Sequence, residues 1–103
     1  MIHELRVYDI VPGQTERQLD LFKNTVIPLF DKHAIKVVGF WETVDSENAK
    51  LVYVCEFDDE DNLRRAWKEF REDSEWIRAK EANDAKGPSV AKITSTVMRQ
   101  LEF

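Results

Sequence analysis

The sequence is poor in the residues that build the most recognisable protein sites. A single cysteine, Cys55, excludes an intramolecular disulfide. The three glycines form neither a phosphate-binding loop nor the turn that carries a nucleophilic serine. The two histidines, His3 and His33, have no carboxylate at the spacing of a metal site, so no metal site is predicted.

Long apolar runs and blocks of one charge are also lacking. No segment is apolar over the length that a membrane span requires, and the first residues do not resemble a targeting peptide. The 20 acidic and 15 basic residues are interspersed and give a net charge of −5, which does not favour nucleic acid or anionic membranes as partners. We therefore expect a cytoplasmic protein.

What the 103 residues do contain is enough apolar side chains, 43% of the total, for one modest core. Alternating patterns predict strands over residues 2–11, 35–44, 50–57 and 89–103. Apolar residues at helical spacing predict a helix from Thr15 to His33 and two helical pieces within 59–85. This βαββαβ order predicts an α+β, ferredoxin-like fold, with an antiparallel sheet of strand order 4-1-3-2 and the helices on one face.

Four local features are predicted within these elements. Thr15 and Gln18 have the spacing of a helix capping box. Pro28 removes a backbone donor inside the first helix and should kink or weaken it near Asn24. Gly39, in the middle of a strand, indicates a bulge or a close backbone approach. The polar residues 45–49 should connect two strands as a hairpin.

The first strand carries an unusual row of alternating side chains. One face has Leu5 and Val7, which we assign to the core. The other face has Ile2, Glu4, Arg6, Tyr8 and Ile10. A buried charge must be paired, so Arg6 should meet Glu4 or, from the neighbouring third strand, Glu56.

Several segments together resemble the NIPSNAP family. They are ELRVY at residues 4–8 with the Pro-Gly pair at 12–13, Pro28-Leu29 followed by His33, VGFW at 38–41, and FREDSEW at 70–76. The last segment is similar to the arginines and terminal Asp-x-x-Trp pattern of the family. Because the segments occur in order along residues 1–103, the sequence is identified as a single NIPSNAP-like domain.

The resemblance implies a homodimeric α/β barrel, in which the sheets of two chains pack face to face. The polar row on the first strand would then face the partner's sheet. The wider superfamily includes cofactor-free monooxygenases, haem-degrading enzymes, isomerases and binding modules, so the resemblance implies no single reaction. Tyr53 and Cys55 stand where family members often carry a histidine and a tryptophan, and a function that depends on that histidine is not carried over.

The candidate binding residues are those that could enter a pocket between helices and sheet. Trp67 lies on a helical apolar stripe and should face the sheet. Arg6 and Tyr8 could bind an anionic or oxygenated ligand, or form a satisfied network with Glu4 at the dimer interface. His33 is either a helix-terminal histidine that contacts free carbonyls or a general base or haem ligand. Trp41 is a core, interface or ligand residue.

Three functions remain open at this point. The first is a NIPSNAP-family homodimer of undefined role with a pocket for a small organic ligand. The second is a cofactor-independent or haem-dependent enzyme of the monooxygenase type, and the third is a non-catalytic protein-interaction module. A core of this size can scarcely hold a haem macrocycle, so we expect no cofactor.

Overall fold

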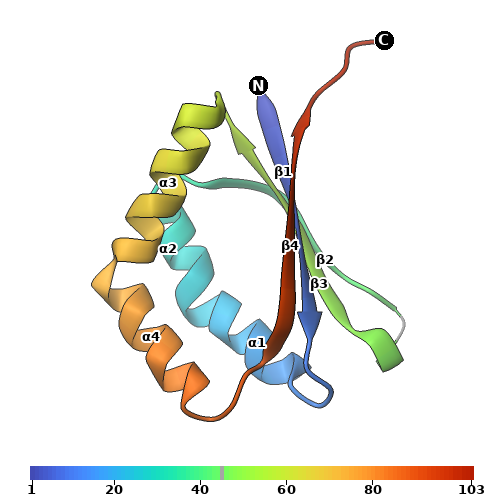
Figure 1. Cartoon of the computed structure of the whole chain (residues 1–103), viewed down its shortest axis with the longest axis vertical. Coiled ribbons are helices and arrows are strands. Elements are labelled where there is room, and N and C mark those ends of the chain that lie inside the picture. Colours follow the sequence, from blue (N-terminus) through green and yellow to red (C-terminus); the bar gives the residue numbers. More distant parts are fainter. Residues whose placement is uncertain (45) are drawn as a thin grey trace.

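The predicted order of elements is present in the structure, a computed structural model that describes residues 1–44 and 46–103 (Figure 1). The strands are β1 (Ile2–Ile10), β2 (Lys36–Glu42), β3 (Lys50–Phe57) and β4 (Val90–Arg99). The helices are α1 (Thr15–Leu21), a π-helical turn (Phe22–Val26), α2 (Ile27–Lys32), α3 (Glu60–Glu72) and α4 (Ser74–Asp84). The last strand ends at Arg99, although its alternating pattern predicted a strand to Phe103.

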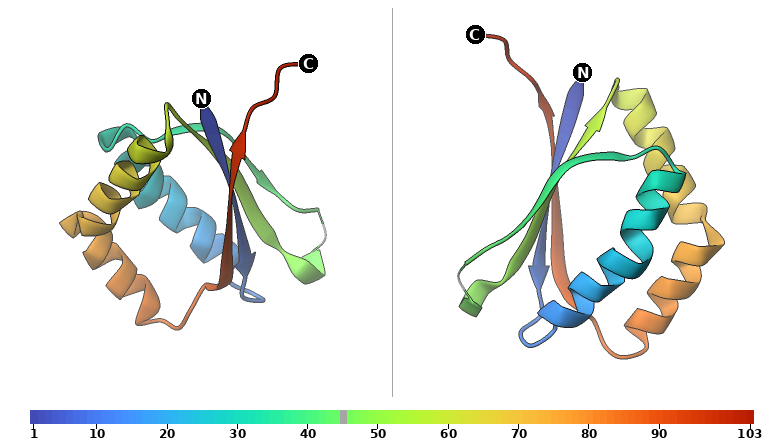
Figure 2. Two further views of the ribbon diagram at one scale, coloured as in Figure 1. Left: turned by 45° about the horizontal axis from the view of Figure 1, so that its top comes forward. Right: turned by 180° about the vertical axis from the view of Figure 1, so that it is seen from behind.

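The sheet has the order β2-β3-β1-β4, with every neighbouring pair antiparallel. Both helical segments pack on one face of it, as all three views in Figures 1 and 2 show. The predicted α+β ferredoxin-like fold and strand order are therefore confirmed. Among the described residues, none of the helices has the length and apolarity that crossing a membrane requires.

The polar row on β1 faces the helices of the same chain. Trp67 of α3 donates its indole N–H to Glu4 over 2.6 Å, and the Tyr8 ring packs edge-on against Phe22 with centroids 5.5 Å apart. The prediction that this row faces a partner's sheet is therefore wrong. Its polar groups can be buried because the helices bring hydrogen-bonding and aromatic partners to them.

Leu5 and Val7, which were predicted for the core, lie on the opposite face of the sheet. They pair across β1 and β3 with Val54 and Val52, and Val52 in turn pairs with Trp41 of β2. None of the five is fully buried, and no described helix covers this side (Figure 2). We call the surface formed by these five residues the open face.

The first helical segment is irregular where Pro28 predicted it to be. The π-helical turn includes Asn24, and α2 follows it directly with Pro28 in its first turn. The turn also directs Phe22 and Val26 into the core. The helix is thus irregular near Asn24, in the form of a π-helical turn.

The predicted capping box is absent. Gln14 is the N-cap of α1 and makes no side-chain capping bond, while Thr15 is already helical. Gln18 is buried instead and accepts a hydrogen bond from the Ser89 hydroxyl at 2.6 Å. Local spacing cannot show whether a glutamine caps its own helix or bonds to a distant residue such as Ser89.

The bulge predicted at Gly39 is confirmed, because the β2–β3 register shifts between Val37 and Gly39. A Cβ atom at position 39 would lie 2.8 Å from the Cη2 atom of Trp41, so the indole covers the glycine. In the connection to β3, Ser46–Asn48 form a 3-10 turn, and Asp45 lies outside the described residues.

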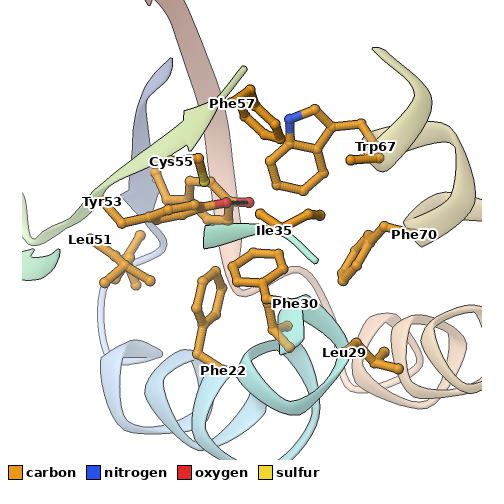
Figure 3. Packing of buried hydrophobic residues seen from close by; sticks show 14 residues of the cluster. Phe22, Leu29, Phe30, Ile35, Leu51, Tyr53, Cys55, Phe57, Trp67 and Phe70 are labelled. Atoms are coloured by element: carbon orange, nitrogen blue, oxygen red, sulfur yellow. Dashed lines mark hydrogen bonds between the residues drawn. The ribbon is translucent and has the colours of Figure 1, made fainter. Parts of the chain in front are cut away.

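The core is mainly aromatic and lies between the sheet and the helices (Figure 3). Phe30 of α2 is near its centre, with ring contacts to Phe22, Tyr53, Trp67 and Phe70 at centroid distances of 5.4 to 6.4 Å. Cys55 of β3 is inaccessible to solvent, and its burial raises the pKa of the thiol to about 12. Its predicted role as a small core residue is confirmed.

Candidate functional site

A cavity of about 510 Å³ lies between the sheet and the helices. Residues of β1, α1, the π-helical turn, α2, α3, α4 and β4 line it. Its aromatic lining residues are Tyr8, Phe22, Phe30, Trp67, Phe70 and Trp76. This mixture of aromatic walls and a few polar groups is typical of sites for small organic molecules.

Arg6 forms the floor of the cavity. Its guanidinium carbon lies 4.4 Å from the centroid of the Trp67 ring, which is the geometry of a cation–π contact. The Nε group donates to the Tyr53 hydroxyl at 2.8 Å, and the two terminal nitrogens donate to Tyr8 and Glu4, each at 3.2 Å. The side chain keeps 17% of its surface exposed, so a bound molecule can touch it.

Glu4 holds the Arg6 side chain in place through a hydrogen-bonded ion pair. One of its carboxylate oxygens accepts from the Trp67 indole, and the other accepts from Arg6 and from the Ser95 hydroxyl. The carboxylate is almost fully buried and fully hydrogen-bonded. The group therefore ties β1 to both β4 and α3.

Glu56, the other predicted partner of Arg6, lies on the far side of the sheet. It shares a face with Val54, as predicted, but this is the open side. Its carboxylate is bound by Lys36 at 3.2 Å and by His3 at 3.1 Å, and these hydrogen bonds lower its pKa in that order of strength. Of the two predicted partners of Arg6, Glu56 is therefore wrong, and Glu4 is the residue that pairs with it.

His33, the candidate catalytic residue, does not line the cavity with Trp67. It caps the end of α2, and its Nε2 atom lies 2.7 Å from a carboxylate oxygen of Asp73 at the junction of α3 and α4. Lys32 donates to the same oxygen at 2.8 Å. The side chain thus contacts a carboxylate rather than helix carbonyls, because the C-terminus of α2 meets the start of α4.

Of the five predicted pocket residues, Arg6, Tyr8 and Trp67 line the cavity. His33 does not, and Trp41 lies on the open face with 53% of its surface exposed. The sequence could not assign these two, because the side that a residue faces depends on how distant elements pack.

A polar corner of the cavity was missed from the sequence. Asn83 donates to the Ser89 hydroxyl at 2.9 Å, and that hydroxyl donates to Gln18. All three residues line the cavity. A buried glutamine one turn before Phe22 on an otherwise apolar stripe is the signal that could have indicated it.

The sequence model of the NIPSNAP family matches residues 3–103. The chain belongs to the NIPSNAP family. No curated protein matches it in sequence. Its NIPSNAP fold is shared with solved structures at low identity, and these therefore show the fold alone.

Two of these structures are themselves NIPSNAP proteins. An uncharacterized NIPSNAP domain protein from Burkholderia xenovorans superposes with a TM-score of 0.86 at 16% identity, covering 100% of this chain and 97% of that one. A NIPSNAP family protein from Agrobacterium tumefaciens gives 0.86 at 16% identity, with coverages of 99% and 94%. An antibiotic biosynthesis monooxygenase is more distant, with a TM-score of 0.60, 17% identity and coverages of 99% and 100%.

The Glu4–Arg6 pair generates a prediction about stability. Arg6→Leu leaves the Glu4 carboxylate buried without its cation, and this should lower the free energy of unfolding by about 3–5 kcal/mol. The double variant Glu4→Gln/Arg6→Leu should be more stable than Arg6→Leu, because it buries no unpaired charge. Urea unfolding of the variants measures this difference, and Lys36→Leu, which removes an exposed cation, is the control. An Arg6→Leu protein as stable as the parent would contradict the analysis.

The Lys32–Asp73–His33 cluster predicts a dependence of stability on pH. Hydrogen bonds from Lys32, then His33, hold the pKa of Asp73 well below its usual range. The ionised Asp73 carboxylate therefore contributes its full share to the free energy of unfolding above the unfolded carboxyl pKa of about 3.9. This contribution is lost as the pH falls below that value. Asp73→Asn should have a lower melting temperature than the parent at neutral pH, because the amide preserves the N-cap of α4 but removes the charge.

This difference in melting temperature should shrink steadily as the pH is lowered from about 5 to about 2. Asp31→Asn, which changes an exposed carboxyl on α2, is the matched control and should show no such trend. A constant difference for Asp73→Asn across this range would mean that the charge of Asp73 contributes nothing.

Proposed function

We propose that this NIPSNAP protein binds a small organic molecule in the cavity between its helices and its sheet. The observation that supports this most directly is the cavity of about 510 Å³, with aromatic walls and the partly exposed guanidinium of Arg6 at its floor. Ligand pockets in proteins have volumes of about 300–1,000 Å³ and combine apolar walls with few convergent polar groups.

The arrangement serves binding better than catalysis. Neither histidine lines the cavity in the part of the chain that the structure describes, and Cys55 is buried elsewhere with a raised thiol pKa. Arg6 is held by Glu4, Tyr8 and Tyr53, so it is preorganised to contact a ligand.

A ligand titration with a cavity-filling variant tests the proposal. Naphthalene carboxylate, added to the protein, should shift the backbone amide signals of Trp67 and Trp76 in a saturable way. Leu21→Trp should abolish these shifts, because Leu21 lines the cavity and an indole would occupy it. Leu19→Trp, a change of equal size at a half-buried residue of the same helix outside the cavity, should leave them intact. Equal shifts in both variants would place binding elsewhere.

We further propose that the protein is a homodimer that pairs through the open face. The apolar side chains of Leu5, Val7, Val52 and Val54 have no described helix above them, and Trp41 stands among them half-exposed. A sheet with one apolar face uncovered needs a second layer, which a second copy can supply. In this arrangement Leu5 and Val7 face the partner, and the polar row of β1 does not.

Sedimentation equilibrium at micromolar concentration should therefore give twice the mass of one chain. Trp41→Lys should shift the protein towards monomer, because a charge would enter the interface. Ile77→Lys is the matched control, since Ile77 is similarly exposed at 43% but lies on α4. A parent protein that sediments as a monomer would contradict the proposed dimer.

A catalytic role is the second candidate, supported by the likeness in fold to an antibiotic biosynthesis monooxygenase. A haem-dependent version with a histidine ligand does not fit the cavity, since neither histidine lines it within the described residues. The cofactor-independent version requires oxygen uptake in the presence of an oxidisable aromatic compound. Oxygen uptake by the parent protein with naphthol, abolished in Leu21→Trp, would support this candidate. Equal oxygen uptake by the parent and by Leu21→Trp would count against it.

A further inference from the structure

We infer that the molecule bound in this cavity is an organic oxyanion, such as a carboxylate, with an aromatic or apolar body, and that Arg6 and Tyr8 hold its charged oxygens. This inference rests on the proposed small-molecule binding and adds the chemical class of the ligand.

The first argument is the number of hydrogen-bond donors on Arg6. A guanidinium has five N–H groups and no acceptor. Three of these N–H groups donate to Glu4, Tyr8 and Tyr53, and the other two have no partner among the described residues. Because Arg6 lines the cavity, a ligand oxygen is the group that can satisfy them.

The second argument is the direction of the hydrogen bond between Tyr8 and Tyr53. Their hydroxyl oxygens lie 2.8 Å apart, and each also accepts from Arg6, so one hydroxyl donates to the other and the remaining proton needs an acceptor. Tyr53 is completely buried and does not line the cavity, whereas Tyr8 does. An unsatisfied buried hydroxyl is costly, so Tyr53 donates to Tyr8, and Tyr8 directs its own proton into the cavity.

Among the residues that the structure describes, the floor of the cavity therefore offers donors and no acceptor. The nearest carboxylate, Glu4, already accepts from Trp67, Arg6 and Ser95, and it does not line the cavity. A ligand group that is itself a donor, such as an amide NH₂ or an ammonium, would find no partner at the floor. A group that only accepts hydrogen bonds fits all the available positions.

The charge around the cavity favours an anionic acceptor over a neutral one. The charged residues that line it are Arg6, Arg71, Lys80, Lys92 and Asp84. Arg6 is paired with the buried Glu4 and Lys80 with Asp84, which leaves Arg71 and Lys92 as the excess of positive charge, although the whole chain has a net charge of −5. Such a local excess of positive charge attracts and retains anions.

The aromatic walls of the cavity indicate the shape of the rest of the ligand. The Trp76 and Phe70 rings lie with centroids 5.0 Å apart and planes tilted by 40°, and Trp67 meets Phe70 edge-on at 5.7 Å, so aromatic faces and edges surround the space above Arg6. A flat apolar body can pack against these rings while its oxyanion reaches the floor.

A matched pair of ligands tests the inference. Naphthalene carboxylate and naphthalene carboxamide have nearly the same shape, but only the first is an anion that purely accepts hydrogen bonds. Isothermal titration calorimetry of the parent protein should give an affinity for the carboxylate about ten- to a hundred-fold higher than for the carboxamide.

Two variants and one control variant assign the preference to named groups. Glu4→Gln/Arg6→Leu removes the cation together with its carboxylate, and should bring the ratio of the two affinities close to one. Lys36→Leu/Glu56→Gln removes a similar pair from the other face of the sheet and should keep the parent ratio. Tyr8→Phe leaves the ion pair in place, and should weaken carboxylate binding about ten-fold while changing carboxamide binding little.

Each outcome decides a different question. Equal affinities of the parent for both ligands would overturn the inference and leave small-molecule binding standing. Binding of neither ligand would count against both. A preference for the carboxylate that is as large in Tyr8→Phe and in the folded double variant as in the parent would overturn the roles of Arg6 and Tyr8. If the double variant does not fold, Tyr8→Phe alone decides their role.

Discussion

The buried ion pair between Glu4 and Arg6 constrains the rest of the structure. Both residues are on strand β1, in the interior of the sheet, and their charges can stay under the helices only because each buried nitrogen and oxygen atom has at least one hydrogen-bond partner. These partners come from α3, from β3 and from β4, which are far apart in the sequence. The main effect of the pair is therefore to specify which face of β1 turns inwards and where Trp67 must lie. Its net contribution to the free energy of unfolding is secondary.

The same constraint explains why the elements were predicted correctly but one face of the sheet was not. Alternation along β1 and β3 is a local signal, and it identified both strands to within a residue. The choice of the inward face followed the rule that Leu5 and Val7 belong in the core. That rule fails here because Trp67, 63 positions beyond Glu4, supplies the donor that the polar row needs. A contact of this range is not visible in the spacing of residues along a strand.

The residues of the candidate site also fall into those that the sequence could indicate and those that it could not. Arg6, Tyr8 and Trp67 could be selected from the sequence because each stood out from its own element, as a charge, a phenol or an indole in a buried row. The polar corner of Gln18 and Ser89 depends on how α1 approaches the start of β4, and this is set by packing of the whole chain. His33 was misplaced because the partner of a helix-terminal histidine depends on which element lies beyond the helix, here the start of α4 at Asp73.

The burial of Cys55 gives the protein an internal reporter of its own unfolding. A thiol that is shielded from solvent and has a pKa of about 12 reacts with alkylating reagents only when the surrounding structure opens. Since Cys55 is the only cysteine of the chain, the rate of its modification reads out the opening of the central sheet at one defined position. A molecule that occupies the cavity would slow this rate by stabilising the closed state, so chemical labelling can detect ligands without knowledge of any reaction.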